Sequence, residues 1–335
     1  MSTFEQHRES DRSAAHGANG RDERFPADKT GWKKSLEDFA MRGVGWIAAA
    51  LYTTLGSRAG ERVGILMYHR VARRVPGLPA PSHNVEPARF REQIEGLLSR
   101  GFTIWPLRRF LDHYESGDRV PPKTIALTFD DGFQTVYTAA FPVLKEFGVP
   151  ASLFVNTAYL DSDEPFPFDG WGMAVRGRAP EASCLPLATG QCREMAASGL
   201  VEIGAHTHTH EDFRGRPNAF RSDLQRSIDI VQERFAPQEM TFAFPYGGTH
   251  NGFAGDELVE EARRSRIVCG LTTESALVNP HSDPLRWGRF NVFPWDTSRT
   301  LAGKLSGWYG WAPRLRKRLN GTLPPAPSTV AGAAP

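Results

Sequence analysis

The chain has 335 residues, enough for one large α/β domain or two smaller ones, and either can bury a proper core. Its net charge of +2 at pH 7 excludes a strong preference for acidic partners such as nucleic acid. Three cysteines without a C-x-x-C spacing exclude a disulfide framework and a cysteine-based metal site, and they predict reduced thiols.

The N-terminal part predicts a polar tail followed by a helical segment at 31–60. Residues 1–30 are polar and lack the apolar core of a signal peptide, which predicts a disordered tail and cytoplasmic residence. Over 31–57 apolar residues recur at helical intervals. The longest uncharged stretch, 43–57, is shorter than the about 20 residues of a membrane span. This helix therefore packs on the domain or lies in a membrane interface.

Strand and helix patterns then alternate along the chain. Strands are expected at 63–68, 102–105, 124–129, 151–156, 201–204, 241–244 and 267–271. Helices are expected from Pro87 to near Gly101 and at 107–114, 137–147, 187–198, 224–235 and 256–264. This alternation predicts an α/β fold, a parallel sheet closed or nearly closed into a β/α barrel over 62–300. The chemistry of such barrels collects at the carboxyl ends of the strands.

Two motifs follow strands of this pattern. The pentapeptide T-F-D-D-G contains Asp130 and Asp131, and the sequence H-T-H-T-H contains His206 and His210. The two histidines face one side if the chain turns helical after its strand, and His208 is then a bystander. One carboxylate and two imidazoles can hold a divalent ion while the neighbouring carboxylate accepts a proton. A turn-forming acidic pair and a surface histidine tract are the non-catalytic alternatives.

The pattern T-F-D-D-G followed by H-T-x-x-H resembles the NodB-homology polysaccharide deacetylases, carbohydrate esterase family 4. The segment F-A-F-P-Y-G at 242–247 is similar to the third motif of that family. The resemblance covers about residues 62–295. It implies a distorted (β/α)7 TIM-like barrel and a metal-dependent hydrolase that removes N-acetyl groups from N-acetylhexosamine units of a glycan. A non-catalytic carbohydrate-binding or scaffolding protein on the same fold is the alternative.

The resemblance also implies roles for single residues. It makes Asp130 the general base, and Asp131, His206 and His210 the ligands of a divalent ion. Zinc is the first expectation for this ion, with cobalt, nickel or manganese as alternatives, because an Asp-His-His set suits several metals. The backbone N–H of Tyr246 is expected to support the oxyanion of the tetrahedral intermediate.

Two departures from the family pattern stand out. The family often has an arginine near the Pro-Tyr of its third motif, where this chain has Ala243 and Phe244, and the C-terminal Leu-x-x-His motif is missing. The N-terminal sequence G-I-L-M-Y-H-R-V resembles a subgroup in which that last motif is permuted to the front, which implies that His69 is the general acid. A histidine hydrogen-bonded at a strand end is the alternative. Arg289 is the candidate substitute for the missing arginine.

Aromatic residues outside the motifs raise two further hypotheses. Phe168 and Trp171, in a loop at 161–186, either stack on sugar rings or only pack. The segment 301–335 is expected to be a tail, basic at 314–318 and then rich in Pro and Ala. With the aromatic residues at 308–311 it suggests peripheral membrane contact, against the alternative of a solvated basic tail.

Overall fold

The structure, a computed structural model, describes residues 31–310. The predicted tail at 1–30 and the basic and Pro/Ala-rich residues 311–335 lie outside the described residues. A parallel sheet with the strand order β7-β6-β5-β4-β3-β1-β8 forms the centre of the molecule, and β2 pairs with β3. The strands are Gly64–Tyr68 (β1), Thr103–Ile104 (β2), Thr124–Phe129 (β3), Ala151–Val155 (β4), Val201–Ala205 (β5), Thr241–Ala243 (β6), Cys269–Leu271 (β7) and Phe290–Asn291 (β8).

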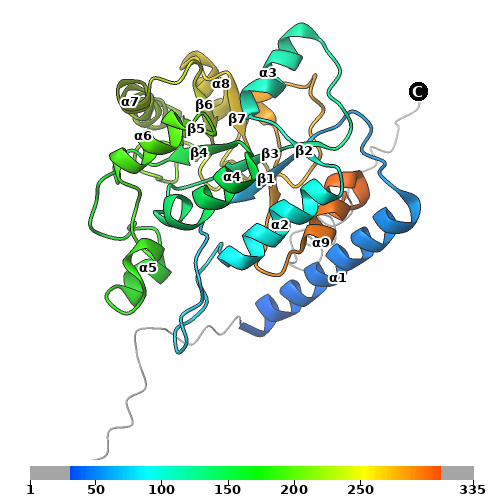
Figure 1. Ribbon diagram of the computed structural model, residues 1–335. Coiled ribbons are helices and arrows are strands. Elements are labelled where there is room, and N and C mark those ends of the chain that lie inside the picture. The colour runs from blue at the N-terminus through cyan, green and yellow to red at the C-terminus, as the bar shows by residue number, and fades with distance from the viewer. Residues whose placement is uncertain (1–30, 311–335) are drawn as a thin grey trace, which may run out of the picture.

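Helices surround this sheet (Figure 1). They are Gly31–Leu55 (α1), Pro87–Ser99 (α2), Leu107–Ser116 (α3), Phe141–Phe147 (α4), Gly170–Val175 (α5), Thr189–Ala197 (α6), Pro217–Phe235 (α7), Asp256–Arg264 (α8) and Ser298–Gly303 (α9). Short π-helical turns at Val136–Ala140 and Lys304–Trp308 and 3-10 turns at Glu181–Ser183 and Pro284–Arg286 complete the set. The alternation predicted from the sequence is confirmed.

Local sequence explains several of these boundaries. Pro87 and Pro217 stand at the first helical position of α2 and α7, where a missing backbone N–H costs nothing. Gly117 and Gly148 end α3 and α4 in the left-handed conformation that glycine adopts without strain. Every residue of β1 and β3 is buried, as expected for parallel strands covered on both faces.

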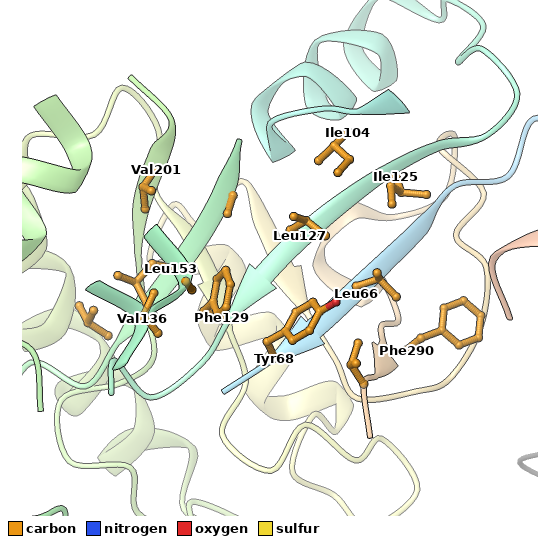
Figure 2. Close-up of a cluster of buried hydrophobic side chains, with 14 of the residues drawn as sticks. Leu66, Tyr68, Ile104, Ile125, Leu127, Phe129, Val136, Leu153, Val201 and Phe290 are labelled. Atoms are coloured by element: carbon orange, nitrogen blue, oxygen red, sulfur yellow. The ribbon is translucent and has the colours of Figure 1, made fainter. Parts of the chain in front are cut away.

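The sheet curls into a distorted barrel, as the sequence predicted. Strand β1 pairs in parallel with β3 on one side and with β8 on the other. On the other side of the sheet, Leu271 of β7 forms an isolated parallel bridge with Trp287, which lies just before β8. Figure 2 shows the apolar side chains of β1, β3, β4 and β8 packed in the core beside this sheet, Tyr68 and Phe129 among them. Because β1 pairs in parallel with β3, with Tyr68 opposite Phe129, a histidine after β1 reaches the same edge as the motif after β3.

The structure contradicts the tail predicted from residue 301 onward, because residues 298–310 are packed. Residues 301–310 do not belong to a tail, because α9 and the turn Lys304–Trp308 pack against α1, and Leu301, Leu305 and Tyr309 are buried. A Cβ at Gly303 would lie 2.6 Å from the carbonyl carbon of Ala48, so glycine permits the close contact between α9 and α1. The apolar run of α9 is too short to give a clear helical period.

Helix α1 packs as predicted but leaves one face uncovered. Met41, Val44 and Ala48 are buried against the core, while Phe39 and Trp46 are exposed. Among residues 31–310 we find no helix with the length and apolar character to span a bilayer. The three cysteines are free thiols, as predicted, and the structure shows that all three are buried.

Candidate active site

The motifs meet at the carboxyl edge of the sheet. Asp130 and Asp131 follow β3, His206 and His210 follow β5, and His69 follows β1. All five line one cavity of about 500 Å³, a volume typical of small-ligand sites. The topology therefore brings together residues that lie up to 141 positions apart, from 69 to 210, in the sequence.

Asp131 and the two histidines form a group with the geometry of a metal site. The Asp131 Oδ1 atom lies 3.3 Å from His206 Nε2 and 3.5 Å from His210 Nε2. The three side chains are buried, and one potential ligand atom of each lies within 4.8 Å of the others. The Nδ1 atom of His206 donates to the Ala243 carbonyl at 2.7 Å, which fixes the ring with Nε2 facing Asp131.

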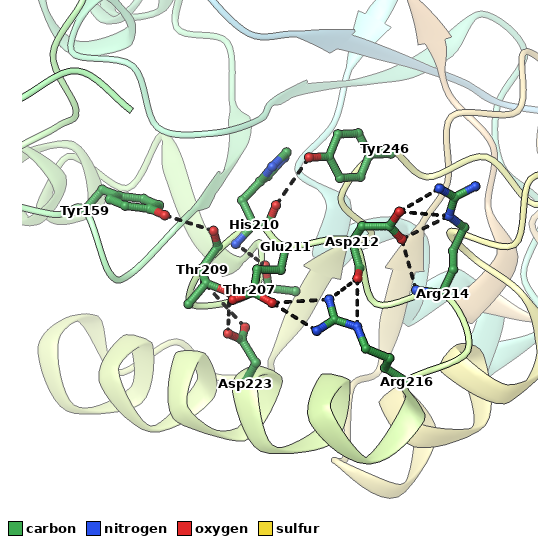
Figure 3. Close-up of polar contacts among 10 residues, drawn as sticks. All are labelled: Tyr159, Thr207, Thr209, His210, Glu211, Asp212, Arg214, Arg216, Asp223 and Tyr246. Carbon is green, nitrogen blue, oxygen red and sulfur yellow. Dashed lines mark hydrogen bonds and ion pairs between the residues drawn. The ribbon is translucent and has the colours of Figure 1, made fainter. Parts of the chain in front are cut away.

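The segment after β5 is not helical. The expectation that a helical turn brings His206 and His210 to one side is therefore wrong. Thr207 and His210 have φ values of 64° and 59°, so the chain turns through left-handed residues instead. Figure 3 shows how Asp223 of α7 fastens this turn. Its carboxylate accepts from the backbone N–H of His208 at 2.6 Å and from the Thr209 hydroxyl at 2.7 Å. The bystander His208 contacts Thr157 outside the group of ligands.

A second turn separates the two carboxylates after β3. Asp131 has a φ of 70°, and the N–H of Gly132 donates to the Asp130 carbonyl at 2.8 Å. This turn points the adjacent side chains to different partners. Burial by itself would raise the pKa of Asp131, but a hydrogen bond from His206 and the charges of His69 and His210 outweigh it and lower the pKa.

Asp130 is held by an arginine that directly precedes β8, two strands away from β3 in the sheet. The Arg289 guanidinium donates to both carboxylate oxygens, at 2.6 and 2.7 Å, and both side chains are buried. Arg289 is itself fixed by the Thr272 carbonyl at 3.1 Å. Burial would raise the pKa of Asp130, but the charge of Arg289, followed by that of His206, holds it below its usual value. The arginine proposed from the sequence thus lies where an orienting cation is needed.

His69 lies in the cavity wall beside a histidine that the sequence analysis missed. The rings of His69 and His83 are stacked with their centroids 4.8 Å apart, and both line the cavity. Burial lowers the pKa of His69 to about 4. His83 lies outside every recognised motif, and only the bridge between Arg70 and Asn84 brings it to the site.

The two loop aromatics behave differently. Phe168 lines the cavity, and its ring stacks on His210 with centroids 4.0 Å apart. Trp171 is buried, and its Nε1 donates to the Pro79 carbonyl at 2.8 Å, which places the ring away from the cavity wall. Trp171 is therefore a packing residue and not a sugar contact. Tyr246 lines the cavity with a φ of 60°, and its ring edge meets His210.

Comparison with known proteins agrees with this site. A family model described as polysaccharide deacetylase matches residues 117–262, which hold Asp130, the three potential ligands and Tyr246. Over this segment the chain is similar to the polysaccharide deacetylases. The family inferred from the motifs is thus confirmed. The matched segment of this deacetylase stops before Arg289 and begins after His69.

Individual relatives extend the likeness over more of the deacetylase chain. It is 26% identical over 262 residues to the poly-β-1,6-N-acetyl-D-glucosamine N-deacetylase of Staphylococcus epidermidis, which covers 72% of this chain and 83% of that protein. The enzyme of the same name from Staphylococcus aureus strain MRSA252 is 23% identical, over 60% of this chain and 65% of its own length.

Solved structures share the fold. The structure of IcaB from Ammonifex degensii has a TM-score of 0.59 and 26% identity, covering 74% of this chain and 98% of that one. The Streptococcus pyogenes deacetylase PplD, solved with acetate, has a TM-score of 0.60 at 20% identity, over 73% of this chain and 98% of that one. The second likeness bears on the fold alone, and it supports the distorted barrel.

Proposed function

We propose that this polysaccharide deacetylase hydrolyses the N-acetyl groups of a poly-N-acetylglucosamine, with a β-1,6-linked polymer as the first substrate to test. One observation carries the proposal: Asp130, paired with Arg289, lies in the same cavity as the buried group Asp131, His206 and His210. The names of the staphylococcal relatives supply the sugar and the linkage.

The donor set fits a divalent ion. One carboxylate and two imidazoles, buried and within 4.8 Å of one another, are the three protein ligands typical of a catalytic zinc site, which keeps a position open. Cobalt, nickel or manganese can take the same ligands. When bound, such an ion polarises a carbonyl and makes water a better nucleophile at neutral pH.

Asp130 and His69 each carry out one of the two proton transfers of the proposed reaction. Asp130 accepts the proton of the attacking water, and the paired Arg289 keeps its carboxylate ionised and fixed in direction. His69, which also lines the cavity, donates a proton to the leaving amine. Burial lowers the pKa of His69 to about 4, so the imidazole is neutral at pH 7 in the free protein, and it takes the proton that it donates from solvent as negative charge develops beside it. The backbone N–H of Tyr246 is the proposed second support for the oxyanion.

Acetate release from a β-1,6-linked N-acetylglucosamine pentamer tests the proposal. The wild-type protein with zinc should release acetate, and Asp130→Asn should abolish release while binding zinc as tightly as the wild type. His69→Gln should lower kcat by about 100-fold or more, the range for loss of a general acid. Full activity in Asp130→Asn would overturn the mechanism.

The non-catalytic alternative makes a different prediction for the same samples. A glycan-binding protein on this fold would bind the pentamer with measurable affinity and release no acetate with any of the four metals. The retained base, ligand and acid positions favour the enzyme, because a site without turnover is under no requirement to keep them together.

Peripheral membrane contact is a second proposal, carried by the outer face of α1. Phe39, Trp46 and Ile47 are between 51% and 75% exposed on this one helix, and the exposed Arg42 lies among them. Apolar side chains next to a cation suit an anionic bilayer surface. The buried Tyr309, which packs on Phe290, takes no part, so of the two segments considered from the sequence it is the helix that carries this proposal.

Flotation with vesicles of phosphatidylglycerol and phosphatidylcholine tests this contact. The variant Phe39→Ser/Trp46→Ser should lose flotation, and Met173→Ser, at an equally exposed position on α5, should keep it. Truncation after residue 300 is unsuitable because it removes the buried Leu301 and Leu305. Equal flotation of both variants would exclude the α1 surface.

A further inference from the structure

A buried ion pair ties the end of β1 to the long loop above the cavity. Arg70 directly follows His69, and its Nη2 donates to Asp169 Oδ2, with both side chains almost fully buried. The guanidinium lies between two rings, 4.0 Å from the centroid of Phe133 and 4.8 Å from that of Trp171. Arg70 lies in the N-terminal segment G-I-L-M-Y-H-R-V, but neither residue of the pair has a step in the proposed reaction.

Asp169 is the immediate neighbour of Phe168, the aromatic side chain that covers His210. The N–H of Asp169 donates to the Phe166 carbonyl at 3.0 Å, and the Asp169 carbonyl accepts from the N–H of Met173 at 3.0 Å. The rings of Phe166 and Phe168 are stacked with centroids 5.0 Å apart. Fixing the Asp169 carboxylate therefore fixes the backbone that carries Phe168.

The residues around the Asp169 carboxylate leave space for it. A Cβ at Gly172 would lie 2.4 Å from Asp169 Oδ2, so the first turn of α5 leaves room for the oxygen only because it has glycine there. Asp169 also lines the cavity together with Asp130 and Asp131. Arg70 pairs with Asp169 as Arg289 pairs with Asp130, which leaves Asp131 as the carboxylate that faces the two imidazoles.

We infer that Arg70 and Asp169 are positioning residues that hold the loop 166–173 down, so that Phe168 forms the wall of the glycan site next to His210. The effect on turnover rests on the proposed function, whereas the effect on the loop does not. Breaking a buried pair leaves an uncompensated charge, and the loop is then expected to open. Substrate binding should suffer while the chemistry, once the glycan is bound, continues.

The test compares Arg70→Met with a matched pair elsewhere. Lys304 and Asp296 form an ion pair of 2.5 Å with both side chains 2% exposed, near α9 and away from the cavity. Lys304→Met therefore breaks an equally buried pair without touching the loop. Each variant is measured for its melting temperature, for the amide exchange of Asp169 and Met173, and for KM and kcat on the pentamer.

We expect Arg70→Met to speed exchange of these two amides by tenfold or more and to raise KM by about tenfold, with kcat changed by less than about threefold. Lys304→Met should lower the melting temperature without either effect. Asp169→Asn, which keeps the shape of the side chain and loses its charge, should lie between the wild type and Arg70→Met.

Slow exchange at Asp169 and Met173 in Arg70→Met, equal to that of Lys304→Met, would overturn the inference. If Arg70→Met does not fold, Gly172→Ala displaces the same carboxylate without creating an unpaired charge, and the same amides report on it. A wild-type protein that releases no acetate would refute the proposed function alone, because amide exchange needs no substrate.

Discussion

The carboxyl edge of the sheet and the contact between α1 and α9 differ in their backbone conformation. Nine non-glycine residues of the described chain have a positive φ, and five of them, His83, Asp131, Thr207, His210 and Tyr246, lie at the candidate active site. Such conformations cost free energy and persist only where surrounding contacts enforce them. At α1 and α9 the backbone is regular, and small residues such as Gly303 allow close packing. Backbone strain is thus found at the active site, where side chains need fixed directions. Regular helix packing stabilises the contact between α1 and α9.

Removing the ion should have the largest effect, and it should be confined to the site. Dialysis against a chelator, or His206→Ala, is expected to lower acetate release by about 1,000-fold or more, because the ion activates both water and carbonyl. Added zinc should restore the dialysed wild type and not His206→Ala. Activity that survives chelation in both samples would contradict the metal-dependent reaction.

Arg289→Lys should have the next largest effect. A lysine cannot make the two parallel hydrogen bonds that Asp130 receives, so kcat/KM is expected to fall by about 100-fold. The pH profile should also move. Because the charge of Arg289 holds the pKa of Asp130 low, Arg289→Met, which removes the charge, raises that pKa and shifts the acidic limb of kcat/KM to higher pH, whereas Arg289→Lys shifts it less. An acidic limb identical to that of the wild type would separate Arg289 from the base.

Gly303→Val tests the packing region. The new Cβ would meet the Ala48 backbone at 2.6 Å, so α9 and α1 must separate, at a cost of about 1–3 kcal/mol of unfolding free energy. Denaturant unfolding measures this loss. The kcat of the folded fraction should equal that of the wild type, and a large change in kcat would mean that the two regions are coupled.

Asp223→Ala should give a smaller effect that acts through the histidine turn. It removes the acceptor for the backbone of His208 and the hydroxyl of Thr209, so the affinity for zinc is expected to fall by about tenfold. Asp229→Ala, on the exposed side of the same helix, is the matched control and should bind zinc as the wild type does. Chelator competition measures both, and equal affinities would show that the turn holds its shape without Asp223.

The sequence by itself determined the alternation of strands and helices, the two metal-site motifs and the family. These features are local: the burial of β3 and the residues T-F-D-D-G that follow it occupy one short stretch of chain. It also pointed to His69 and Arg289, but only as candidates. Whether they reach the site depends on the pairing of β1 with β3 for His69 and of β8 with β1 for Arg289, and no local pattern specifies either pairing.

Only the tertiary structure decided how the side chains are held. Arg289 and Asp130 are separated by 159 positions, and Arg70 and Asp169 by 99, so neither pair has a sequence signature. The structure also replaced the expected helical turn after β5 with left-handed residues, removed Trp171 from the cavity and placed α9 in the core. The physical reason is common to all of these. Hydrophobic periodicity reports which face of an element is buried, whereas the partner of a buried charge or ring is chosen by where distant elements meet.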